Sequence, residues 1–99
     1  ADLAQQVSFK LQPHVAMRAF ALAYKHLGRT CSLEEMESVY MERWEEMKPF
    51  SARFHARTVK LMEDGELTME NCMEPSVMNA LAEELAPLVP LPYENQSAA

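Results

Sequence analysis

Glycine is scarce in this chain, with two residues among 99. Sheets joined by tight turns usually need more glycine, because those turns use positive φ angles. The scarcity argues against a mainly β fold, and isolated glycines cannot form a phosphate-binding loop. Leucine, alanine, methionine and glutamate are abundant instead, and all four favour helices.

Cysteine and long apolar runs are scarce as well. Cys31 and Cys72 are the only cysteines, and their spacing matches neither a CxxC motif nor a zinc pattern. We expect two buried, reduced thiols, with a disulfide as the alternative in an oxidising compartment. No apolar run approaches the ~20 residues that span a bilayer, and no signal peptide is visible. These features predict a cytoplasmic protein without a membrane partner.

Charge is unevenly distributed along the sequence, which has a net charge of −6. Residues 1–30 carry four bases and one acid, whereas residues 31–99 carry five bases and fourteen acids. This asymmetry fits either a basic contact surface on an acidic body or a simple solubilising surface. The length and the 48% hydrophobic content predict one folded domain over residues 1–99. A polar lead is expected over 1–6 and an extended, proline-containing tail over 87–99.

The apolar spacing predicts a small bundle of about four helices. Their approximate bounds are 13–27, 33–48, 51–62 and 76–86. Ser32 and Glu35 form a capping-box pattern at the start of the second helix. Gly28 is placed to end the first helix, and Pro49 is expected to break the second.

Two further serines and a glycine complete the expected helix boundaries. Ser51 and Ser76 each stand where an N-cap is needed, because a side-chain oxygen there can accept a free backbone N–H. Gly65 is expected to stop the third helix.

The stretch VSFKLQ, residues 7–12, alternates apolar and polar side chains at the period of a strand. The expected fold is therefore mainly α, with one short N-terminal β-strand as an option. An isolated strand leaves its backbone groups unpaired, so it would pair with a second copy. A homodimer follows from that option.

No motif for catalysis or cofactor binding is present. Neither cysteine lies in a nucleophile motif, so we expect no enzyme activity and no cofactor. His14 and Met17 lie three residues apart, and eight methionines could suit a soft metal ion. Their scatter through the apolar stripes favours structural packing, and no metal ligand is assigned. A metal-binding helical protein is the third hypothesis.

Protein contact is the leading hypothesis, because aromatic and methionine side chains exceed what a small core needs. A basic strip on one helix and a pair of glutamates on another could orient a partner. We therefore predict a small regulatory, inhibitory or adaptor protein. The residues expected to bind its protein partner are Tyr40, Trp44, Glu45, Glu46, Arg53, Arg57 and Lys60.

The second hypothesis is a DNA-binding transcriptional regulator. Residues 7–47, from VSFKLQ through the turn GRTCS to the helix LEEMESVYMERWEEM, resemble the ribbon-helix-helix family of dimeric DNA-binding proteins. The resemblance implies that two chains pair their strands and insert this ribbon into the major groove. It places Ser8, Lys10 and Gln12 against bases, and the backbone near Thr30 against phosphate.

Overall fold

The computed structural model describes residues 3–90 and consists of helices. The elements are α1 (Leu3–His26), α2 (Leu33–Glu42), α3 (Trp44–Glu63), α4 (Pro75–Leu85) and the short 3₁₀ helix η1 (Ala86–Leu88). No strand occurs among the described residues. The prediction of a mainly α bundle of about four helices is confirmed.

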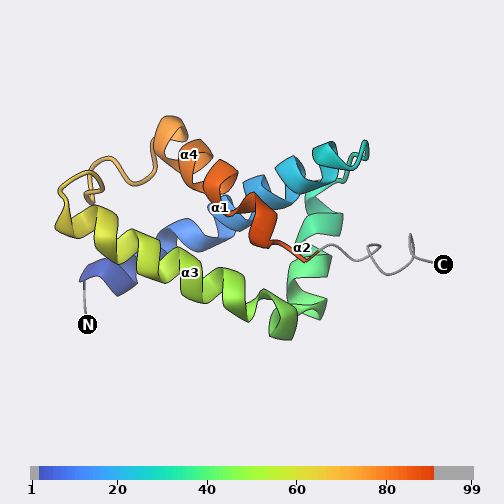
Figure 1. Ribbon diagram of the computed structural model, residues 1–99, viewed down its shortest axis with the longest axis horizontal. Coiled ribbons are helices and arrows are strands. Elements are labelled where there is room, and N and C mark those ends of the chain that lie inside the picture. The colour runs from blue at the N-terminus through green and yellow to red at the C-terminus, as the bar shows by residue number, and fades with distance from the viewer. Residues whose placement is uncertain (1–2, 91–99) are drawn as a thin grey trace.

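Helix α1 is the centre of the molecule, and every other helix contacts it. Helices α3 and α4 pack along it, while α2 crosses one end and connects α1 to α3 (Figure 1). The largest fully buried side chains lie between these elements. They are Phe20, Phe50, Phe54, Leu11, Met47, Leu67, Leu81 and Leu85.

The strand expected over residues 7–12 is wrong, because this stretch lies inside α1. Val7 and Leu11 are both 0% exposed, whereas Phe9 is 67% exposed. Residues four apart share a helix face, but residues two apart do not. The polar lead expected over 1–6 is also wrong where it is described, because residues 3–6 are helical and Ala4 is buried.

Two prolines lie inside helices that they were expected to begin or break. Pro13 falls in the middle of α1, and Pro49 falls in the second turn of α3. Proline removes one helical hydrogen bond, because it has no backbone N–H. Both prolines are exposed, and so are Phe9 and Glu45, whose carbonyl groups four residues earlier lose this donor and are left to water. Solvent access therefore makes both positions tolerable.

The second predicted helix ends earlier than expected, at Glu42 rather than before Pro49. Arg43 has φ −110° and ψ 33°, which interrupts the helix between α2 and α3. One continuous helix over 33–63 would measure about 46 Å. The break lets α2 cross the end of α1 before α3 returns along it (Figure 1). Ser51 lies inside α3 and caps nothing.

The expected stops and one expected cap are confirmed. Gly28 and Gly65 have φ angles of 72° and 77°, a conformation that a Cβ makes costly. The Ser32 side chain accepts the backbone N–H of Glu35, as an N-cap should. Ser76 is not a cap, because α4 already begins at Pro75.

The extended tail expected over 87–99 is only partly described. Its first residues belong to η1, and Val89 is buried against the core. Residues 91–99 lie outside the described residues.

Two serine variants test these boundaries. Ser32→Ala is expected to lower the free energy of unfolding by about 0.5–2 kcal/mol, because the first turn of α2 loses its cap. Ser76→Ala is the matched control and should be neutral or slightly stabilising, since its exposed side chain caps nothing. Urea denaturation followed by circular dichroism measures both. Equal losses of unfolding free energy in the two variants would contradict the assignment of Ser32, and not Ser76, as an N-cap.

Candidate functional site

Helix α2 contributes little to the core. It buries only Met36, whereas α1 buries nine residues. Leu33 is 66% exposed and Met41 is 73% exposed, and Trp44 at the start of α3 is 41% exposed. We call the surface formed by Leu33, Glu34, Glu37, Met41 and Trp44 the elbow surface.

Trp44 rests on a well-packed support. Its ring lies 5.6 Å from that of Tyr40, which in turn meets Phe20 edge-on at 6.5 Å. The Tyr40 hydroxyl accepts a hydrogen bond from Gln12 Nε2 at 2.8 Å, and burial raises the pKa of Tyr40. Tyr40 therefore connects α1 to the elbow surface and holds one side of Trp44. A partner that covered Trp44 would meet a ring that is already positioned.

The glutamates near Trp44 differ in their partners. Glu45 pairs with Lys48 at 2.8 Å, and Glu46 pairs with Arg43. These two predicted partner-binding carboxylates therefore have bases of their own chain beside them. Glu34 and Glu37 are exposed and take part in none of the ion pairs found within residues 3–90. Neither glutamate was among the residues predicted to bind a partner.

The basic strip predicted on the third helix is divided in the structure. Arg57 is half-buried and reaches across to α4, where its Nε lies 3.0 Å from Glu84 Oε1. Arg53 and Lys60 are exposed on α3. Arg57 thus links two helices, and only Arg53 and Lys60 remain as surface bases of the strip.

The residues proposed for DNA contact are now placed on helices and a turn. Ser8 is buried, and its hydroxyl lies 3.0 Å from Nδ1 of His55 on α3. Gln12 Nε2 donates to Ser51 Oγ as well as to Tyr40, each at 2.8 Å. Lys10 and Thr30 are exposed. No ribbon forms from these residues in the described chain, and DNA binding stays a prediction from the sequence.

Neither thiol is arranged for nucleophilic chemistry. Both cysteines are free, with Cys72 buried and Cys31 half-buried. Partial burial raises the pKa of the Cys31 thiol, and the Glu35 carboxylate nearby raises it further. Less thiolate is therefore present at neutral pH than for an ordinary cysteine. Within residues 3–90, no group of three or more histidine, cysteine or acidic side chains could hold a metal ion.

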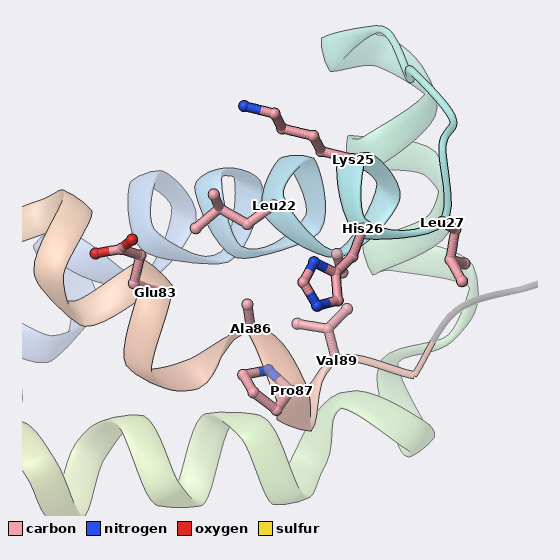
Figure 2. Close-up of a pocket in the computed structure, with 9 residues that line it drawn as sticks. Leu22, Lys25, His26, Leu27, Glu83, Ala86, Pro87 and Val89 are labelled. Atoms are coloured by element: carbon pink, nitrogen blue, oxygen red, sulfur yellow. The ribbon is translucent and has the colours of Figure 1, made fainter.

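An apolar groove lies between the end of α1 and the α4–η1 junction (Figure 2). Its volume is about 800 Å³, and Leu22, Ala86 and Val89 form part of its lining. Figure 2 shows the His26 ring beside Val89, while Glu83 lies toward the opposite end. This groove could not be predicted from the sequence, because the end of α1 and η1 are sixty residues apart in the chain.

Comparison with protein-family models, with curated proteins and with solved structures found no match for this chain. Among the described residues, no helix combines the length and apolar character needed to cross a membrane.

Proposed function

We propose that this chain is a small regulatory or adaptor protein that binds another protein through the elbow surface. The observation that carries this proposal is the exposure of Leu33 and Met41 on α2 and of Trp44 at the start of α3. Tryptophan and methionine are enriched in protein interfaces, and tryptophan often dominates their binding energy. Inhibition of the bound partner is one form that such regulation takes.

The packing around Trp44 supports the proposal further. Binding costs free energy when side chains must be ordered at the interface. Trp44 is already held against Tyr40, and Tyr40 is held by Phe20 and Gln12. Less ordering is therefore required for Trp44 than for a freely rotating surface side chain.

Affinity capture from native extract tests the proposal. Trp44→Ala is expected to reduce capture of the bound protein by about tenfold or more, because it removes the one aromatic anchor among the five residues of the elbow surface. Met69→Ala is the matched control, since Met69 is 42% exposed but lies in the connector between α3 and α4. Capture should be measured with and without nuclease, and circular dichroism should confirm that both variants fold.

Two results would contradict the proposal. One is equal capture by the wild-type chain and by Trp44→Ala. The other is loss of the captured protein after nuclease treatment, which would favour contact through nucleic acid. Met41→Ala provides a second test of the elbow surface. The Met41 side chain is 73% exposed, so this substitution is the one least expected to alter folding.

A further inference from the structure

One line of side chains on α2 faces solvent along the length of the helix. Leu33, Glu37 and Met41 follow each other at intervals of four residues, so they share one side of the helix. Leu33 and Met41 are separated by about 12 Å along its axis. Glu34 lies beside this line, and all four side chains are exposed. The elbow surface is therefore both apolar and acidic.

Helix α2 carries no base to balance its acids. It contains four glutamates, and its last turn has no basic residue. Cations are favoured near the C-terminal end of a helix, because the backbone carbonyl groups there are partly negative. Glu42 lies in that turn, and the adjacent Arg43 is already paired with Glu46. A positive charge supplied from outside beside Glu42 would be stabilised by that carboxylate and by the helix end together, whereas one beside Glu34 or Glu37 would be stabilised by the carboxylate alone.

This inference rests on the proposed function and names the class of its partner. We propose that the elbow surface binds a basic amphipathic helix of another protein. Apolar side chains of that helix cover Leu33, Met41 and Trp44. Its lysine or arginine side chains reach Glu34 and Glu37, which have no ion-pair partner in the described chain.

The charge of the surface selects this occupant over others. An amphipathic helix presents apolar side chains at i, i+3 or i+4, and i+7, which suits a short apolar line. Basic residues beside that line would complement the glutamates and speed association. Nucleic acid and anionic lipid are disfavoured here, because both would bring more negative charge to an acidic surface.

The probe for this proposal is a synthetic leucine–lysine helix of about 14 residues, without aromatic side chains, whose leucines repeat at i, i+3, i+4 and i+7. Trp44 is the only tryptophan of the chain, so its emission reports directly on the elbow surface. The full chain should show a shift of Trp44 emission to shorter wavelength when the lysine peptide is added. A leucine–glutamate peptide of the same pattern should cause no shift.

Two double variants with the same change in net charge separate local from general attraction. Glu34→Lys with Glu37→Lys should weaken binding of the lysine peptide by about tenfold or more. Glu66→Lys with Glu70→Lys should weaken it by less than about threefold, because these exposed positions act only through screened, long-range attraction. Equal weakening by both pairs would overturn the proposal. The proposal would also be overturned if Trp44 emission did not shift when either peptide was added.

Failure of this inference can be told apart from failure of the proposed function. Suppose that Trp44→Ala loses the captured protein but the Glu34/Glu37 pair retains it. The elbow surface would then bind a protein, and the basic partner would be wrong. If both Trp44→Ala and the Glu34/Glu37 double variant lose the captured protein, both proposals are supported. A shift of Trp44 emission that depends on the concentration of the chain alone would assign the surface to a second copy and overturn the basic helix.

Discussion

A Phe20→Ala variant is expected to lose about 3–5 kcal/mol of unfolding free energy. Phe20 is 0% exposed on α1, the helix that contacts all the others. Its ring lies 6.4 Å from that of Tyr24 and 6.5 Å from that of Tyr40. Alanine would leave a cavity where α1 meets α2. The free energy of unfolding of a native protein is only about 5–15 kcal/mol, so this loss would leave the folded state of this small domain marginally stable.

Urea denaturation followed by circular dichroism gives this loss directly. Phe20→Leu is the control, and it should lose less because it fills most of the same space. The emission of Trp44 should also change in Phe20→Ala before any urea is added, since Phe20 supports Tyr40 and Tyr40 supports Trp44. A loss below about 1 kcal/mol would mean that the site collapses without a cavity and that this packing matters little.

Features set by neighbouring residues could be predicted from the sequence. Gly28 ends a helix because a positive φ angle is needed there, and that requirement is local. Ser32 caps a helix because its hydroxyl reaches an N–H three residues away. The helical class followed from composition in the same way. None of these features depends on where the other helices lie.

Features set by distant contacts could not be predicted in this way. The break at Arg43 has neither glycine nor proline to announce it, and it follows from how α2 and α3 pack on α1. Spacing placed Arg57 on a basic strip, but only the fold brings Glu84 beside it. Trp44 was predicted as a binding residue, whereas Met41 was missed because Glu37 interrupts the apolar stripe.

The candidate site likewise combines features that could be predicted from the sequence with features that could not. Aromatic residues and charges near Trp44 could be chosen from the sequence, since such side chains are common in interfaces. Whether Leu33 lies in the core or on the surface depends on how little of α2 the rest of the bundle covers. Core and interface stripes have the same period, so periodicity cannot separate them.

The error over residues 7–12 has a simple geometric cause. In a strand, Val7, Phe9 and Leu11 would all face one side, because side chains alternate. In a helix, Val7 and Leu11 still share a side, but Phe9 points elsewhere. Two of the three apolar residues therefore fit both structures. Val15, 0% exposed four residues after Leu11, continues the helical line.

Replacing Leu11 and Phe9 separately by alanine distinguishes these two arrangements. Leu11→Ala is expected to lose about 2–5 kcal/mol of unfolding free energy, because the side chain is fully buried. Phe9→Ala should change stability by no more than about 0.5 kcal/mol, because its side chain is 67% exposed and lies on the outer side of α1. Urea denaturation with a common baseline measures both. A large loss for both variants would instead mean that the two side chains share one buried face, as they would in a strand paired between two chains, and the DNA-binding hypothesis would then gain the ribbon that α1 does not supply.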